Sequence, residues 1–368
     1  MFLYATITFT VFLLMVLGVN SYSKQSMGAV ETISKRNYLY AKIKVVNLIV
    51  SVVLIILWVL TAFRSENIGN DTKTYIYYFN LFAREGIDVN RSFEIGYQML
   101  NVLIGKVTQD PHAFLVIIAS MLYGGTAYFL YKYSRNILVS LCLFYCVCFS
   151  IYTSMFRQGI AMVIAMYGYY QLKEGKRLKA ALLFTFAMLF HTSAIVCFLL
   201  FIDTKLFTNK KIVFFTTLTL SLLSMLGIFN AFFISILPQY GHYFYGQYAS
   251  SGWLAVTYDL IRNIVFFWFV NKSVDKNKRS DRLIISNMCF LLLFSALGYS
   301  VNLFTRASQY FLLISIIELP NAFYSAKMKN KSLWMFIICT VMLIMFILIM
   351  VFRPNWNHLY PYEFWSYN

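Results

Sequence analysis

Arg157 stands at the start of a long apolar stretch, in the segment "TSMFRQGIAM" of residues 153–162. A guanidinium is planar and permanently charged, and it binds phosphate or carboxylate with two parallel hydrogen bonds. Its place beside an apolar helix therefore suggests that it holds an anion. Arg306, in "TRASQYF", has the same setting. For both residues, reaching out to the lipid headgroups is the plainer interpretation.

Three other kinds of side chain add possible chemistry. His191, in "LFHTSA", lies within an apolar stretch and could accept a proton near neutral pH, or could be a satisfied core histidine. Asp71 in "NIGND" and Glu94 in "RSFEIGY" are carboxylates of the longest polar stretch, and each could instead be an ordinary solvated acid. Asp259 and Arg262 are three residues apart, so one helix face brings them together as a structural or functional pair.

The composition places these residues in a polytopic membrane protein. The 368 residues are 60% hydrophobic and 12% charged, against roughly 25% charged in a soluble domain. Several stretches are long enough to cross ~30 Å of hydrocarbon. We expect an all-α helix bundle forming one membrane domain over residues 1–368. The candidate spans are 2–20, 45–63, 112–131, 136–153, 157–172, 180–202, 212–237, 255–271, 283–303, 307–325 and 333–352.

The distribution of lysine sets the expected topology. Lys- and Arg-rich loops favour the cytoplasm, and the basic loop 203–211 obeys this rule only if 180–202 enters and returns on one side. Thr192 and Ser193 after His191 are N-cap candidates for a second short helix. We therefore predict about ten crossings, a re-entrant hairpin with His191 at its tip, both termini outside, and the Lys-free loop 238–254 outside. A single crossing that violates the charge rule is the alternative.

The outer face is expected to carry the polar stretch 64–111. Within it, residues 95–107 have the pattern of an amphipathic helix lying at the interface, with Ile95, Met99, Val102 and Leu103 on one face. The functional acids named above fall in the same stretch. The sequence therefore predicts that the polar chemistry collects in the outer half of the membrane.

Several classes of function are disfavoured by absent motifs. The six cysteines all sit in apolar segments without histidines at ligand spacing, so we interpret them as buried thiols. The four histidines are widely spread, and nucleotide-binding glycine motifs are absent, so no metal and no cofactor is expected. The net charge of +17 is explained by membrane topology, so no nucleic-acid partner is expected.

The order of motifs resembles the EpsG family of bacterial polysaccharide polymerases, which are related to Wzy-type polymerases. The resemblance runs from about residue 60 to 362, through "NIGNDTKTYIYYF", "FEIGYQMLN", "FRQGIAM", "KEGKRLK", "LFHTSA", "RASQYFLLISIIELP" and "YPYEF". "HTSA" departs from the family, where a basic residue more often follows the histidine, and this weakens a phosphate-binding role for that turn. The family residues carry over to Arg64, Asp71, Glu94, Arg157, His191 and Arg306.

The resemblance implies a GT-C-like fold and a metal-independent glycosyltransferase in the bacterial cytoplasmic membrane, active on its outer face. Such an enzyme joins oligosaccharide repeat units carried on undecaprenyl pyrophosphate. The resemblance also implies membrane lipid, a flippase and a chain-length regulator as partners. The polymer could be a capsule, an O-antigen or a secreted exopolysaccharide.

The expected roles follow from charge and proton chemistry. A pyrophosphate leaving group needs fixed cationic donors when no metal is present, and this assigns Arg157 and Arg306 to it. His191 is assigned as base or proton relay, with Asp71 or Glu94 orienting sugar hydroxyls. Further substrate-binding residues are assigned to the same site: Arg64, Gln158, Arg262 and Tyr75.

Two other classes stay open. A lipid-linked oligosaccharide flippase would also need a cationic cavity, but it should show an internal repeat and a site near the midplane. An acyltransferase that modifies the polysaccharide would also use an intramembrane histidine, but it would need a cytoplasmic entry for its acyl donor. Neither an internal repeat nor an entry motif is evident in the sequence.

Overall fold

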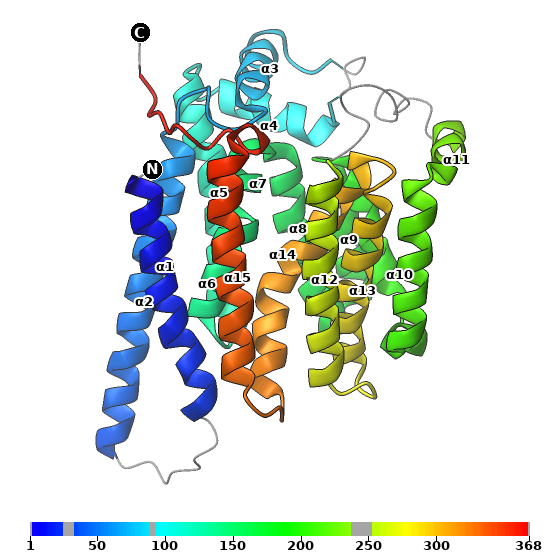
Figure 1. The fold of residues 1–368 in the computed structure, drawn as a ribbon. Coiled ribbons are helices and arrows are strands. Elements are labelled where there is room, and N and C mark those ends of the chain that lie inside the picture. The colour runs from blue at the N-terminus through cyan, green and yellow to red at the C-terminus, as the bar shows by residue number, and fades with distance from the viewer. Residues whose placement is uncertain (1, 25–32, 89–92, 237–251, 367–368) are drawn as a thin grey trace. The chain divides into compact units, whose positions relative to one another are not determined.

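The regular secondary structure of the described part of the chain is helical. The computed structural model describes residues 2–24, 33–88, 93–236 and 252–366 (Figure 1). An isolated bridge between Arg64 and Phe364 is the only extended pairing in these ranges. The helices are α1 (Phe2–Lys24), α2 (Ile33–Ala62), α3 (Thr72–Glu85), α4 (Ile95–Gly105), α5 (Pro111–Tyr133), α6 (Ile137–Val147), α7 (Phe149–Ser154), α8 (Phe156–Lys173), α9 (Arg177–Met188), η1 (Thr192–Phe201), η2 (Lys205–Thr208), α10 (Lys210–Met225), α11 (Ile228–Ile236), α12 (Trp253–Ser273), α13 (Arg279–Leu297), α14 (Asn302–Ser325), α15 (Lys331–Phe352) and η5 (Pro354–Trp356).

Contacts divide the chain into two compact units. Unit 1 comprises Met1–Val163, Leu189–His191 and Met328–Asn368, and unit 2 comprises Ile164–Met188 and Thr192–Lys327. Each is described by itself below. Most of the predicted outer loop 238–254 falls outside the described residues.

Six helices in the described ranges are long and apolar enough to cross a membrane. Helices suit such apolar stretches because lipid offers no partner for backbone N–H and C=O groups. The pair α10 and α11, bent by 84° at their junction, would make a seventh span. Ten crossings remain a prediction, because α8 and α14 are not among the six. The six segments are Leu3–Asn20, Lys44–Ala62, Pro111–Tyr133, Trp253–Ser273, Arg279–Leu297 and Lys331–Phe352.

Unit 1 packs α1 against α6 and α15, and α2 against α5. Its interior contains buried tyrosines whose hydroxyls are matched by threonines of neighbouring helices. The Thr8–Tyr145 oxygens lie 3.0 Å apart, and those of Thr126 and Tyr152 lie 2.7 Å apart. Such pairs hold helices together where apolar side chains alone give little preference for another helix over lipid.

The prediction of a single helix over 136–153 is wrong. Helix α6 ends at Val147, and the short α7 ends at Ser154, just before Arg157. The end of α7 supplies hydrogen bonds to a different segment: the Ser154 hydroxyl accepts from the Asn70 N–H at 3.2 Å, and the Thr153 carbonyl accepts from Thr72 Oγ1 at 3.4 Å. The helix therefore stops where its polar groups bind the loop before α3.

The polar end of unit 1 consists of α3, α4 and the C-terminal segment 354–366 (Figure 1). The amphipathic helix predicted over 95–107 is present as α4, which ends at Gly105. Of the four residues predicted to share its apolar face, Ile95, Met99 and Leu103 are exposed and Val102 is half-buried. Helix α3 was not predicted, because its run of tyrosines and polar residues looked like loop. It packs on α4 through its buried face.

The C-terminal segment is tied to the loop after α2 by backbone hydrogen bonds. Trp365 N–H donates to the Phe63 carbonyl at 2.8 Å, and Ser65 N–H donates to the Glu363 carbonyl at 2.9 Å. Gly69 N–H donates to the His358 carbonyl at 3.0 Å. These bonds satisfy the polar backbone of a loop that carries no regular structure of its own.

In unit 2, α12, α13 and α14 pack on one another, and α10 packs on α13. Buried amides link the helices. Asn287 donates to the Phe311 carbonyl at 3.0 Å and to the Ser315 hydroxyl at 3.1 Å. Asn263 donates to the Ser295 hydroxyl at 2.7 Å. These bonds fix the helix register, since each buried amide needs its partner.

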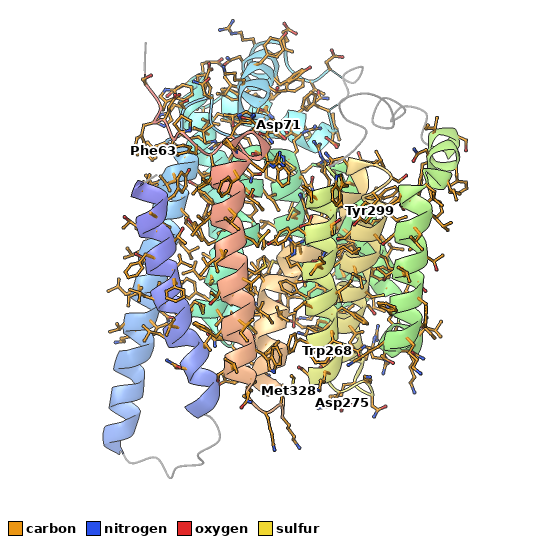
Figure 2. The ribbon with its side chains drawn as sticks, viewed as in Figure 1. Phe63, Asp71, Trp268, Asp275, Tyr299 and Met328 are labelled. Atoms are coloured by element: carbon orange, nitrogen blue, oxygen red, sulfur yellow. The ribbon has the colours of Figure 1, made fainter. Side chains whose placement is uncertain are left out.

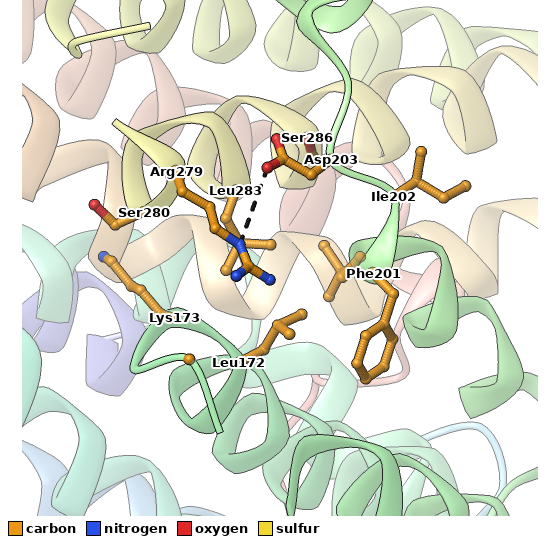
Figure 3. Close-up of a pocket in the computed structure, with 11 residues that line it drawn as sticks. Leu172, Lys173, Phe201, Ile202, Asp203, Arg279, Ser280, Leu283 and Ser286 are labelled. Carbon is orange, nitrogen blue, oxygen red and sulfur yellow. Dashed lines mark ion pairs between the residues drawn. The ribbon is translucent and has the colours of Figure 1, made fainter. Parts of the chain in front are cut away.

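The predicted helix break at His191 is present. Helix α9 ends at Met188, and the 3₁₀ helix η1 begins at Thr192 and packs back on α9. The two ends of this hairpin meet: the guanidinium carbon of Arg177 lies 5.4 Å from the Phe201 ring centroid. Lys173 and Asp203 line one small cavity together with Arg279, whose Nε is 3.9 Å from Asp203 (Figure 3).

The basic loop 203–211 lies with the basic loop 271–282. Arg282 binds Asp203 at 2.7 and 2.9 Å, and the Thr208 carbonyl accepts from Asn271 and Lys276. The Arg282 guanidinium lowers the pKa of Asp203 below its ordinary value. The charge rule required these two loops to share a side, and the geometry agrees with it. The depth that the hairpin reaches in a membrane stays a prediction.

One buried ion pair joins α8 to α14. Lys173 Nζ lies 2.6 and 2.7 Å from the two oxygens of Glu318, whose side chain is fully buried. The spacing of the sequence does not predict this pair, because its two residues are 145 positions apart. Removal of the lysine would leave the charge of the buried carboxylate uncompensated and would destabilise the fold.

The topology can be tested by cysteine labelling. Lys73→Cys on α3 and Leu206→Cys in the basic loop both replace exposed residues. We expect a membrane-impermeant thiol reagent to label position 73 in intact cells and position 206 only after permeabilisation. Wild type should stay unlabelled because its six cysteines are buried. Labelling of position 206 in intact cells would reject the re-entrant hairpin.

The Lys173–Glu318 pair gives a stability prediction. Lys173→Met leaves Glu318 buried and unpaired, and should lower the free energy of unfolding by about 3–5 kcal/mol. Adding Glu318→Leu should restore most of it. Lys176→Met is the control, because its ion pair with Glu174 is exposed and should contribute less than ~1 kcal/mol. Thermal unfolding in detergent measures all three; equal losses from Lys173→Met and Lys176→Met would contradict the assignment.

Candidate functional site

Glu94, Arg157 and His191 meet in unit 1. Arg157 Nη1 donates to Glu94 Oε2 at 2.6 Å, and His191 Nδ1 lies 3.5 Å from Glu94 Oε1. The side chain of Arg157 is 23% exposed, that of Glu94 is 14% exposed and that of His191 is 17% exposed. Glu94 and Arg157 are 63 residues apart in the sequence, and His191 follows Arg157 on a different segment of the chain. One carboxylate thus holds a guanidinium with one oxygen and faces an imidazole with the other.

The backbone fixes Glu94 against His191. Glu94 is the N-cap residue of α4, and Gly96 N–H donates to the Leu189 carbonyl at 2.8 Å. A Cβ at position 96 would lie 2.7 Å from that carbonyl oxygen, so the approach requires glycine. Residues 189–191 form the tip between α9 and η1. The start of α4 is therefore bonded directly to the turn that carries His191.

Gln98 holds the two described residues Asp88 and Phe93 that precede Glu94. Gln98 donates to the Phe93 carbonyl at 2.7 Å and to the Asp88 carbonyl at 3.1 Å, and it accepts from the Asp88 N–H. Gln98 itself is buried. These three bonds hold Phe93 and Glu94 in place without involving the Glu94 carboxylate.

Arg157 lies in the first turn of α8, where the helix dipole disfavours a cation. The carboxylate of Glu94 offsets that cost, and two aromatic rings stabilise the guanidinium further. The guanidinium carbon lies 4.3 Å from the Phe93 centroid and 5.9 Å from that of Tyr97. Within the described part of the chain, Arg157 Nε is buried and makes no hydrogen bond. The guanidinium is thus oriented but keeps donor capacity unused.

Tyr75 and Asp71 reach the same region from α3. The Tyr75 ring stacks on Phe156, with centroids 4.9 Å apart, and meets the Tyr97 ring at 5.9 Å. Asp71, labelled in Figure 2, is the half-buried N-cap residue of α3. Its neighbours Asn70 and Thr72 bind the end of α7. Tyr75 therefore packs on the first residue of α8, and the neighbours of Asp71 bind the end of α7.

Arg64 and Gln158 are more deeply placed. Gln158 is 1% exposed. Arg64 is fully buried and donates to the carbonyls of Thr61 and Ile68, with its guanidinium 4.7 Å from the Phe156 centroid. Burial lowers the pKa of Arg64 to about 10, so it stays charged at neutral pH. This geometry supports a structural role for Arg64 at the junction of α2 and α3.

Arg262 and Arg306 belong to unit 2. Arg262 Nη1 lies 2.8 Å from Asp259, and its Nε donates to Asn263 at 3.0 Å, so the predicted pair with Asp259 is confirmed. Arg306 is half-buried in the first turns of α14. The grouping of these two arginines with Arg157 stays a prediction from residue type.

A polar hollow lies at the polar end of unit 1. It has a volume of about 460 Å³ and is lined by residues 65–67 and 363–366. Glu363 accepts from Ser65 at 3.2 Å and from Asn67 at 2.9 Å. Carboxylate, amide and indole groups together are the side chains that hydrogen-bond and stack on sugars. The sequence did not predict this hollow, because the pairing of residues 296 and 298 apart cannot be inferred from spacing.

The arrangement in unit 1 can move a proton and hold an anion. Glu94 can accept the Nδ1–H of His191, which leaves Nε2 as a proton acceptor and stabilises the imidazolium that forms. Arg157 can donate to an anion through the nitrogens that Glu94 does not use. Phe93 and Tyr97, which cover the guanidinium, were not singled out from sequence; only their closeness to Glu94 in "RSFEIGY" could have suggested them. No group of three metal-binding side chains was found among the described residues.

Comparison with known proteins gives one match. The model of the EpsG family matches residues 47–364. No curated protein and no solved structure matches the chain. Since the family match covers most of the sequence and includes Glu94, Arg157 and His191, the chain belongs to the EpsG family.

Proposed function

We propose that this membrane protein is a polysaccharide polymerase, a glycosyltransferase that joins undecaprenyl-pyrophosphate-linked repeat units on the outer face of the bacterial cytoplasmic membrane. The EpsG family is associated with polymerase-type membrane proteins. The observation that carries the proposal is the contact of Glu94 with both Arg157 and His191. It joins a proton acceptor to a fixed cation, which are the two functions that this transfer requires.

His191 takes the proton in the proposed reaction. A sugar hydroxyl of one repeat unit attacks the anomeric carbon of the growing chain, and its proton passes to His191 Nε2. The bond from the anomeric carbon to pyrophosphate breaks, and undecaprenyl pyrophosphate leaves. Glu94 orients the imidazole through Nδ1. This role for Glu94 refines the sequence-based one, in which it oriented sugar hydroxyls; Asp71 keeps that assignment.

Arg157 stabilises the charge that develops on the leaving pyrophosphate. Its donors are fixed by Glu94 and Phe93 before the reaction, so no reorganisation is needed as charge forms. Arg306 is assigned to the same task on residue type alone. The polar hollow beside Glu363 offers space for sugar rings in unit 1. A flippase that delivers the units and a chain-length regulator are the proposed protein partners.

Replacement of His191 tests the proton transfer. His191→Gln keeps a hydrogen-bonding side chain but cannot accept a proton at neutral pH, so transfer should fall by roughly 10²–10⁴-fold. Polymer length on a gel should collapse to single repeat units at unchanged membrane levels of protein. His358→Asn is the control, since His358 is exposed and Asn tolerates its positive φ of 45°.

The same strains separate the alternative functions. A polymerase defect leaves lipid-linked single units on the outer leaflet, a flippase defect leaves them on the inner leaflet, and an acyltransferase defect leaves polymer length unchanged. Full-length polymer from well-expressed His191→Gln would refute the base role.

Replacement of Arg157 tests the anion site. Arg157→Lys keeps the charge but loses the planar fork, and we expect transfer to fall by roughly 10²-fold. Arg84→Lys is the matched control, because Arg84 is exposed on α3 in the same unit. The rate of transfer should fall in Arg306→Lys as it does in Arg157→Lys. Wild-type polymer lengths in the Arg157 variant would show that this arginine only reaches toward headgroups.

A further inference from the structure

Unit 2 contains a long apolar groove between α10 and α12. Both helices pack on α13, and residues of both line a cavity of about 760 Å³. Four large side chains of α10 are exposed and line this groove: Phe214, Phe215, Leu218 and Leu222. Phe267 of α12 lines it as well. Exposed apolar surface of this kind is costly in water and favourable against hydrocarbon.

The groove is basic at one end. Lys210 and Lys211 line it there, and the Lys210 Nζ lies 5.1 Å from the Trp268 ring centroid. Lys272 Nζ lies 5.0 Å from the same ring. Like charges gathered around one indole repel one another, and a bound anion would relieve that repulsion. The acids of these loops have other partners: Asp203 is bound by Arg282, Asp275 accepts from the Asn277 N–H, and Asp281 accepts from the Asp275 N–H.

The other end of the groove is marked by Tyr299, whose hydroxyl lies 2.7 Å from that of Thr257 near the start of α12. Figure 2 shows Trp268 and Tyr299 at opposite ends of this helix pair. Eleven residues separate Thr257 from Trp268, which is ~17 Å of α-helix. Half of the hydrocarbon core is ~15 Å thick. The groove therefore has the length of one acyl chain from one leaflet.

We propose that this groove binds an anionic glycerophospholipid, with its phosphate on Lys210, Lys211 and Lys272 and one acyl chain along α10 and α12. The basic end assigns the lipid to the cytoplasmic leaflet, where anionic headgroups and basic residues meet. A polyprenyl carrier active on the outer face would place its phosphate at the opposite end. The inference is independent of the proposed polymerase activity, because it concerns neither Glu94, Arg157 nor His191.

The test uses the full-length protein, purified and delipidated in detergent, and native mass spectrometry with phosphatidylglycerol. Phosphatidylcholine with the same acyl chains measures the contribution of the headgroup charge. We expect one tight phosphatidylglycerol site. Lys210→Ala/Lys211→Ala should weaken it by about fivefold for each lysine removed, and should leave phosphatidylcholine binding unchanged.

Two further variants make the result specific. Leu218→Trp fills the groove and should weaken binding of both lipids by at least tenfold. Lys278→Ala removes one positive charge from the neighbouring basic loop 271–282 but does not line the groove, so phosphatidylglycerol binding should persist. Equal phosphatidylglycerol affinity in Lys210→Ala/Lys211→Ala and Lys278→Ala would overturn the headgroup site.

Unchanged binding in folded Leu218→Trp would overturn the acyl-chain site. Tighter binding of undecaprenyl phosphate than of phosphatidylglycerol, with the same dependence on Lys210, would replace the glycerophospholipid by a polyprenyl lipid. Binding of no lipid by a protein that forms dimers would assign the groove to a second copy of the chain. Circular dichroism and gel filtration establish that each variant is folded.

Discussion

Backbone polar groups that leave a helix in apolar surroundings must find another partner, and this constraint organises unit 1. At the turn between α9 and η1 the Leu189 carbonyl has no helical partner, and it accepts from Gly96 instead. That single bond brings the start of α4 to the turn that carries His191, and so places Glu94 opposite the imidazole. The end of α7 obeys the same constraint, because its freed groups bind Asn70 and Thr72. At both of these helix ends, the freed backbone or side-chain groups bind a segment that carries candidate site residues.

The sequence predicted features that depend on local pattern. The break at His191 followed from an apolar stretch interrupted by Thr192 and Ser193, and helix α4 followed from its amphipathic period. Features that depend on distant pairing were not accessible. Nothing in the spacing of residues shows that Glu94 binds Arg157, that Lys173 binds Glu318, or that segment 354–366 closes the loop after α2. Helix α3 was not predicted, because the residues of its buried face stand among polar residues in the sequence. These buried residues include Tyr75, Ile76, Phe79 and Phe82. The roles assigned to the site residues stay predictions. For Arg64, which was grouped with the substrate-binding arginines, the structure adds that its guanidinium donates to two backbone carbonyls.

Lysine and arginine occupy different kinds of position in this protein. Lysines gather in the loops around 205–211 and 272–278 of unit 2, where a mobile point charge suffices for topology and lipid headgroups. Arg64 and Arg157 instead hold fixed geometries, one among carbonyls and one between a carboxylate and aromatic faces. The planar fork allows this, since several donors can be directed at once. The net charge of +17 therefore comes from two groups of residues, the loop lysines and the fixed arginines, which composition alone does not distinguish.

The ties between the C-terminal segment and the loop after α2 set an order of events during biosynthesis. The Tyr362 hydroxyl donates to the Leu60 carbonyl across 302 residues, and the bonds of Trp365, Glu363 and His358 bridge similar separations. At ~5–20 residues per second, a ribosome needs about 15–60 s to synthesise the intervening chain. During that interval the loop at 63–70 has emerged but lacks the segment that satisfies its backbone. The outermost layer of unit 1 is therefore assembled last, after α15 has inserted, and the membrane insertion machinery must tolerate an open loop beside the future site until then.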